Sequence, residues 1–159
     1  MIIDTKNNPP KNKFLVKLIA PKNLENKQKT FVVSESKAFG KTYHKPMWQG
    51  DTAVAWVKEF GKFYLETDEN LPTIIWKNEQ QNFEHGDKLF FEIKDNQTGI
   101  ENFELLSNNQ WQLISLDAKN NLLTANLDEH WQSGKQNVQL IVSDKGGNRA
   151  TKTFSVQIK

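Results

Sequence analysis

Apolar residues recur at every second position along most of this chain. Phe14, Val16 and Leu18 alternate with polar or charged neighbours, and the same alternation continues through "LFFEI" at 89–93 and "VQLIV" at 138–142. A period of two places alternate side chains on opposite faces of an extended strand, whereas a helix needs a period near 3.6. The pattern therefore predicts an all-β fold.

The segments with strand character are short, and turn residues separate them. They lie at 14–20, 30–34, 53–57, 63–67, 72–76, 89–93, 102–106, 111–116, 122–127, 138–142 and 153–158. About seven of them follow Pro72, with turn signals at the spacing of roughly 8–12 residues that is typical of an antiparallel sandwich. One helical turn is expected at 127–134, where Asp128 can cap it and Gly134 can end it.

A boundary between two modules is predicted at "ETDENLP", 66–72, because this segment is charged and ends in proline. Residues 13–67 would form an N-terminal β module. Its four or so strands are few for an independent domain, so it is either incomplete or supported by the second half. Residues 72–159 would form a second β-sandwich. Residues 1–12, which consist largely of Asn, Lys and Pro, are expected to be a disordered leader.

The composition excludes several classes of function. The chain has no cysteine, which removes disulfides, thiol nucleophiles and cysteine–zinc sites. Arg149 is the only arginine, the lysines are scattered and the net charge is +2, so nucleic acid is not an expected partner. No apolar run approaches the ~18 residues that a membrane helix needs, so no membrane insertion is expected. The start, "MIIDTKNNPP", lacks the order of a signal peptide, which leaves a cytosolic protein or a mature or excised piece of a larger one.

No catalytic motif is found. The three histidines, His44, His85 and His130, form no H-E-x-x-H or H-x-H pair, and a zinc site needs three or four convergent ligands. The nucleophile motifs G-x-S-x-G and S-x-x-K are also absent. We therefore expect loop histidines and no enzymatic activity.

Two pairs of adjacent acidic residues are candidates for acid–base chemistry. They are Asp68 with Glu69, and Asp128 with Glu129. Neighbouring side chains point apart on a strand, and acid–base catalysis needs facing groups in a dry pocket. Solvated surface charge is the better interpretation of both pairs.

Aromatic residues allow two interpretations. The five tryptophans are Trp48, Trp56, Trp76, Trp111 and Trp131. In a small sandwich without disulfides, aromatic side chains usually supply the core, although exposed ones can form a platform for a glycan or an interface. We expect Trp111 and Trp131 to be buried in the second module, together with Phe91, Ile93, Ile100, Val138, Leu140, Val142, Phe154 and Val156.

Two turns carry an aspartate followed by glycine. Asp144 precedes Gly147 and Asn148, and Asp95 precedes Gly99. An aspartate can accept backbone N–H groups a few residues on, and Gly or Asn tolerates the positive φ of such turns. In a seven-strand sandwich these would be the B–C and F–G turns, which emerge at one pole.

The same pole raises the alternative of a calcium site. Its candidate ligands are Asp68, Glu69, Asp95 and Asp144, with loop carbonyls supplying the rest of the six to eight oxygens that calcium takes. Turn capping is the favoured role, and no cofactor is otherwise expected.

Four ordered segments carry a more specific resemblance: "EFGKFYLETDENLPTI", "IKDNQTGIENFEL", "WQLISLDAKNNLLTANLDE" and "SGKQNVQLIVSDKGGN". They resemble the C-terminal region of the lysostaphin-type zinc endopeptidases of Gram-negative bacteria, which carry non-catalytic immunoglobulin-like modules after the protease. The matching residues are Phe60, Gly61, Phe63, Asp68, Pro72, Ile74, Asp95, Thr98, Gly99, Ile100, Trp111, Asp117, Lys119, Asp144, Gly147 and Asn148. Leu71 departs from the pattern, since it replaces the first proline of a pair.

The resemblance implies an immunoglobulin-like second module that acts as a spacer or docking surface in a cell-envelope peptidase, in the periplasm or at the cell surface. The zinc motifs of that family are absent here, so zinc would belong only to a missing upstream domain. The implied partner is an envelope protein or the parent's own upstream domain. The alternative is a module that binds glycan or peptidoglycan through exposed aromatic residues.

Overall fold

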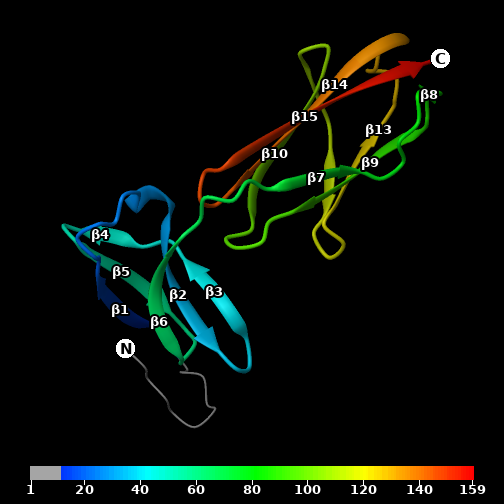
Figure 1. Ribbon diagram of the computed structural model, residues 1–159. Coiled ribbons are helices and arrows are strands. Elements are labelled where there is room, and N and C mark those ends of the chain that lie inside the picture. The colour runs from blue at the N-terminus through cyan, green and yellow to red at the C-terminus, as the bar shows by residue number, and fades with distance from the viewer. Residues whose placement is uncertain (1–11) are drawn as a thin grey trace. The chain divides into compact units, whose positions relative to one another are not determined.

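The computed structural model describes residues 12–159, and the chain divides into two compact units. Unit 1 ends at Glu69 and unit 2 begins at Asn70. Strands make up nearly all of the regular structure (Figure 1), and the described residues contain one helical element, the short 3₁₀ turn Lys27–Lys29. The predicted leader, 1–12, lies outside the described residues except for its last position. The predicted all-β fold, with two small antiparallel sandwich modules in tandem, is confirmed.

No helix among residues 12–159 is both long enough and apolar enough to cross a membrane.

Unit 1 consists of two three-stranded antiparallel sheets. The first sheet has the order β1 (Phe14–Ile19), β5 (Thr52–Val57), β4 (Met47–Gln49), and the second has the order β3 (Gly40–His44), β2 (Thr30–Ser36), β6 (Lys62–Thr67). Six strands are therefore present where the sequence indicated about four. The two missed strands, β3 and β4, are short, and their pairing with longer neighbours defines them.

The core of unit 1 is small and lies between its two sheets. Its buried members are Val16, Val32, Ala53, Ala55, Val57 and Phe63. Gly61 precedes β6 where the chain passes very close to β2: a Cβ at this position would lie 2.2 Å from the carbonyl oxygen of Glu35. The close approach of the two backbones therefore requires glycine here.

Unit 2 is a two-sheet sandwich with immunoglobulin-like strand order. One sheet has the order β12 (Ser115–Asp117), β13 (Leu122–Asn126), β9 (Lys88–Lys94), β7 (Thr73–Trp76), and the other has the order β11 (Gln110–Gln112), β10 (Ile100–Ser107), β14 (Gly134–Asp144), β15 (Arg149–Ile158), β8 (Asn82–Phe83). In immunoglobulin notation these orders correspond to D-E-B-A and C′-C-F-G, with β8 added beside G. All pairs are antiparallel except β15 with β8.

The inward faces of both sheets form the core of unit 2. Seven of the predicted core residues are buried, namely Phe91, Ile93, Val138, Leu140, Val142, Phe154 and Val156, and Ile100 packs against them while partly buried. Trp131 is 3% exposed and is confirmed as a core residue. The prediction for Trp111 is wrong, because this side chain is 62% exposed. Its neighbour Gln112 points inward and is buried, so alternation along β11 turns Trp111 outward.

The expected helical turn at 127–134 is also absent. Asp128 closes a tight turn instead, accepting the N–H of His130 on Oδ1 at 3.0 Å and that of Trp131 on its carbonyl oxygen at 3.1 Å. Gly134 has a φ of +103° and opens β14 rather than ending a helix.

Candidate functional site

The B–C turn of unit 2 is organised by one carboxylate. Asp95 Oδ2 accepts the N–H groups of Gln97 at 2.9 Å and of Gly99 at 2.7 Å. Gly99 has a φ of +84°, a conformation that other residues adopt only with strain. The carboxylate thus supplies the hydrogen bonds that a reversing backbone would otherwise lack.

The F–G turn uses the same device with deeper burial. Asp144 and Asn148 are 0% and 2% exposed. The backbone N–H and the side-chain amide of Asn148 donate to the two carboxylate oxygens of Asp144, each at 2.9 Å. The backbone closes the turn as well, since the N–H of Gly147 donates to the carbonyl of Asp144 at 3.1 Å. A charged acceptor held by two donors makes this a rigid turn.

The two turns lie side by side. The N–H of Lys145 donates to the carbonyl of Gly99 at 3.1 Å, and carboxylate oxygens of Asp95 and Asp144 lie within 4.8 Å of each other. Asp95 Oδ1 is buried and has no hydrogen-bond partner among the described residues. Carboxylate oxygens are ligands that calcium accepts, but two side chains supply few of the six to eight oxygens it takes.

The other two calcium candidates belong to unit 1. Asp68 is buried, and its N–H donates to the carbonyl of Lys29 at 3.0 Å, while Glu69 is exposed. A calcium site that would join these residues to Asp95 and Asp144 remains a prediction.

A small cavity adjoins the B–C turn. Its volume is about 240 Å³, and its lining includes Ile93, Ile100, Leu116 and Asp95. Pockets for small-molecule ligands usually span roughly 300–1,000 Å³ and contain several convergent polar groups. The cavity is therefore small for a substrate site.

Unit 1 contains a Ser–His–Glu cluster that the sequence analysis missed. Ser34 Oγ lies 2.9 Å from His44 Nε2, and Glu59 Oε2 lies 3.7 Å from the same ring nitrogen. Burial lowers the pKa of His44 below its usual value, with Glu59 opposing that shift. The three residues come from β2, β3 and the β5–β6 connection, so no local spacing in the sequence could reveal them.

This cluster does not have the geometry of a nucleophilic triad. In a triad the serine and the acid contact opposite nitrogens of the imidazole, so that the acid orients the ring and the ring activates the serine. Here both Ser34 and Glu59 approach Nε2, and Ser34 is 2% exposed. The arrangement joins strands β2 and β3 rather than presenting a nucleophile to solvent.

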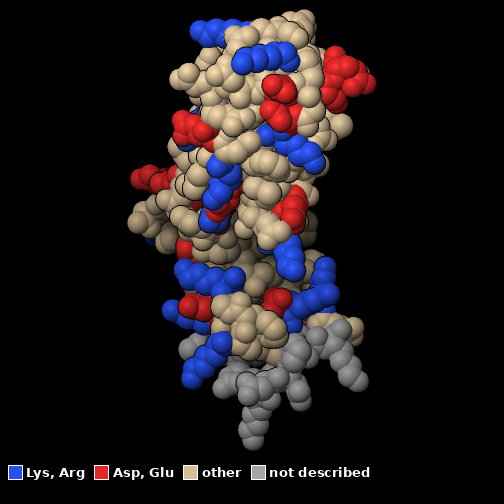
Figure 2. Space-filling model, turned by 90° about the vertical axis from the view of Figure 1, so that its right-hand side faces the viewer, with Lys and Arg blue, Asp and Glu red and all other residues tan. Residues whose placement is uncertain are grey.

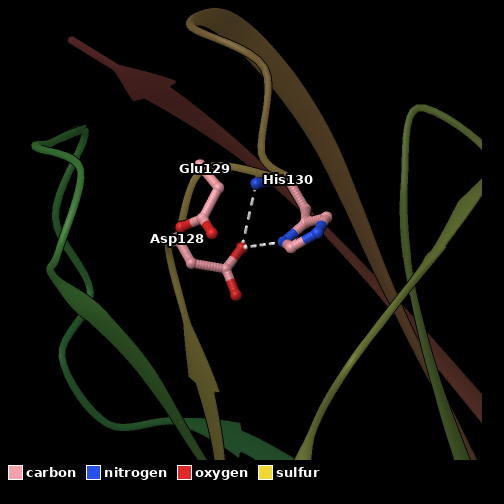
Figure 3. A group of neighbouring side chains, drawn as sticks. All are labelled: Asp128, Glu129 and His130. Carbon is pink, nitrogen blue, oxygen red and sulfur yellow. Dashed lines mark hydrogen bonds and ion pairs between the residues drawn. The ribbon is translucent and has the colours of Figure 1, made fainter.

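His130 lies in the Asp128 turn (Figure 3), and His85 lies beside it. Ligand atoms of Asp128, Glu129 and His130 lie within 4.8 Å of one another, and Asp128 Oδ1 is 3.2 Å from His130 Nδ1. His85 Nδ1 lies 3.2 Å from the carbonyl oxygen of Asp128, and its Nε2 lies 3.1 Å from Ser133 Oγ. Asp128 and Glu129 converge because 128–131 is a turn and not a strand. The side chain of His130 is 77% exposed, which leaves the group open to water.

A few charged side chains elsewhere form ion pairs. In unit 1, Lys41 Nζ donates to Glu66 at 2.9 Å, and this bond is the main cause of a raised pKa for Lys41. In unit 2, hydrogen bonds from Lys77 and Lys94 lower the pKa of Glu92 to about 2. On the face drawn in Figure 2, blue and red residues are interspersed. Such mixed charge is typical of solvated strands.

Exposed tryptophans occur once in each unit. Trp56 in unit 1 is 56% exposed and Trp111 in unit 2 is 62% exposed, while Trp48, Trp76 and Trp131 pack against the cores. Trp111 lies opposite Leu106 on the outer face of the five-stranded sheet. These two tryptophan side chains are available for an aromatic contact with a ligand.

No protein-family model and no curated protein matches the chain. Among solved structures, an endo-β-1,4-mannanase from Thermotoga petrophila is similar at 10% identity with a TM-score of 0.48, over 58% of this chain and 20% of the mannanase chain. A chimeric titin Z1Z2–Z1Z2 tandem is similar at 14% identity with a TM-score of 0.39, over 93% of this chain and 92% of the titin chain. This chain spans about a fifth of the mannanase chain.

Proposed function

We propose that the chain is a non-catalytic pair of β modules that spaces or docks a larger cell-envelope protein, as the C-terminal part of an envelope peptidase. One observation carries the proposal: the polar side chains that could take part in catalysis form hydrogen bonds within the modules. Asp95 and Asp144 hold backbone N–H groups of their own turns, and Ser34 holds His44. These groups stabilise the modules themselves.

The peptidase context rests on the ordered motifs described above. Several of them serve turns and close backbone contacts in this fold, including Gly61 beside Glu35, Asp95 with Gly99, and Asp144 with Asn148. A module that spaces or docks needs a fixed shape, and such contacts supply it. The proposal places the chain in the periplasm or at the cell surface, beside an envelope protein or the parent's own upstream domain.

An assay for hydrolysis tests the non-catalytic role. The purified chain, incubated with zinc and cell-wall fragments, is expected to release no new amine ends. Hydrolysis of an amide by a bound zinc ion needs about three protein ligands to the zinc, an open position for water and a base. A His85→Ala/His130→Ala variant is the control, because these histidines lie in or beside the exposed Asp128 turn. Zinc-dependent release by the native chain above this control would refute the proposal.

A second candidate function is binding of glycan or peptidoglycan, and exposed Trp111 is the observation that favours it. Flat aromatic side chains can stack against sugar rings while neighbouring polar groups fix their orientation. In this case Trp111→Ala would abolish retention of the chain on insoluble peptidoglycan. Equal retention of the native chain and the variant would remove the glycan role for this residue.

A further inference from the structure

The first sheet of unit 1 has an outer face that differs from an ordinary solvated sheet. Its inner face contributes Val16, Ala53 and Ala55 to the core. Alternation along the strands then places Leu15, Lys17 and Ile19 of β1 on the outer face, together with Trp56 and Val54 of β5 and Met47 of β4. We refer to these six residues as the Trp56 face.

Large apolar side chains dominate the Trp56 face. Leu15 lies directly opposite Trp56, and Met47 lies directly opposite Val54, which is itself only 3% exposed. Ile19 is 81% exposed, Met47 is 61% exposed and Trp56 is 56% exposed. The solvent face of an antiparallel sheet is usually polar, and adjacent exposed apolar residues mark an interaction surface.

The charged side chain on this face is a lysine, and lysines also adjoin its Leu15–Trp56 end. Lys17 lies on the face opposite Val54. Lys13 precedes the edge strand β1 and Lys58 follows the central strand β5, just beyond Leu15 and Trp56. None of the three lysines makes an ion pair with a described residue. The three strands contain no Asp or Glu.

The nearest carboxylate along these strands is already neutralised. Asp51 lies in the turn between β4 and β5, and its carboxylate is 2.8 Å from Lys27 Nζ. Unpaired positive charge therefore accompanies the apolar side chains. A complementary partner has to offer both negative charge and an apolar layer. The two must lie no further apart than the length of one side chain.

We propose that the Trp56 face docks on an anionic lipid surface. The headgroups of such a surface attract nearby lysines, and the acyl boundary beneath them accepts apolar side chains. Tryptophan is enriched at this depth because its ring is amphipathic, and lysine can extend its ammonium group back to the headgroups. Docking of this kind is peripheral and requires no membrane-spanning helix.

The inference rests on the docking role proposed above and names its partner. Its failure is distinguishable from failure of that role, because vesicle binding and the release of amine ends are separate measurements.

Co-sedimentation of the full chain with lipid vesicles tests the proposal. Vesicles of phosphatidylcholine mixed with phosphatidylglycerol are expected to bind the chain, and phosphatidylcholine alone is expected to bind it much less. Binding should weaken as salt rises, because exposed charges are screened. Trp56→Ala should weaken binding on the order of tenfold, and Lys17→Gln about fivefold.

Matched controls come from the same unit. Phe39 is 64% exposed, and both Phe39 and Lys37 lie in the turn between β2 and β3, which belongs to the other sheet. Phe39→Ala and Lys37→Gln should therefore bind vesicles like the native chain. Equal loss in the controls, or no preference for the anionic vesicles, would overturn the proposal. A dimer in solution that Trp56→Ala converts to a monomer would also overturn it, in favour of an interface between two copies.

Discussion

The carboxylate of Asp144 accepts both the backbone N–H and the side-chain amide of Asn148 at 2.9 Å, and both residues are buried from solvent. Asp144→Ala is expected to lower the free energy of unfolding by about 1–2 kcal/mol, because the variant leaves the donors of Asn148 buried without their acceptor. Urea unfolding followed by far-UV circular dichroism measures the change.

Asp117 provides a matched control for Asp144. Its carboxylate also closes a turn, accepting the N–H of Lys119 at 3.1 Å and the side-chain amide of Asn120, but all three residues are exposed. Water can replace the lost acceptor in Asp117→Ala, so its loss of stability should be clearly smaller. Equal losses in the two variants would contradict a special role for the buried Asp144–Asn148 pair.

Trp131 is buried and Trp111 is exposed in unit 2, so truncating them to alanine should change the free energy of unfolding by very different amounts. Trp131 is 3% exposed within the core, so Trp131→Ala is expected to cost about 3–5 kcal/mol. Trp111 is 62% exposed, so Trp111→Ala should change stability by less than about 0.5 kcal/mol. Thermal unfolding of both variants, compared with the native chain, measures the difference. Similar costs would mean that Trp111 packs against something in solution.

Alternation and turn chemistry predicted the fold because both act locally. The hairpin between β10 and β11 shows this, since Asn108 and Asn109 have φ values of +47° and +66°, the conformation that a two-residue hairpin turn needs. The direction of Trp111 was missed because both faces of a strand at "WQLISL" would carry apolar residues. Trp111 and Leu113 would lie on one face, and Ile114 and Leu116 on the other. Only pairing with β10, which buries Gln112, selects one phase.

The candidate sites were less predictable because they join distant segments. Ser34 and His44 meet through the β2–β3 ladder, and Glu59 reaches them from another connection. The Trp56 face likewise depends on the register of β1 against β5. Periodicity indicates which residues share a face of one strand, but it does not indicate which strands pair.

Gly61 should tolerate no side chain. A Cβ at this position would lie 2.2 Å from the carbonyl oxygen of Glu35, and a backbone atom cannot move aside as a flexible side chain can. Gly61→Ala is expected to cost about 3 kcal/mol through overpacking. It should also accelerate hydrogen exchange across the β2–β6 pairs near Glu35 and Lys62.

A position can require glycine either because its φ is positive or because a Cβ would have no space, and Gly40 separates these two reasons. It has a φ of +66°, but no atom lies within 4 Å of a Cβ built there. Gly40→Ala should cost about 1–2 kcal/mol from backbone conformation alone. Its effect on hydrogen exchange should stay within the β2–β3 turn. Unchanged exchange at the β2–β6 pairs in Gly61→Ala would refute the close-contact explanation.

His44 should make the stability of unit 1 depend on pH. Burial lowers its pKa below the usual value of 6.5, so the folded state favours the neutral ring, which lies 2.9 Å from Ser34 Oγ. The unfolded chain therefore binds more protons in the window below pH 6.5. Stability is fully present above that pH and should fall as the pH drops from 6.5 through the lower folded pKa. His44→Gln, which stays neutral, should remove this loss in unfolding curves measured across the window. His130→Gln, a change at a side chain that is 77% exposed, should keep it, and a native pH profile in His44→Gln would refute the assignment.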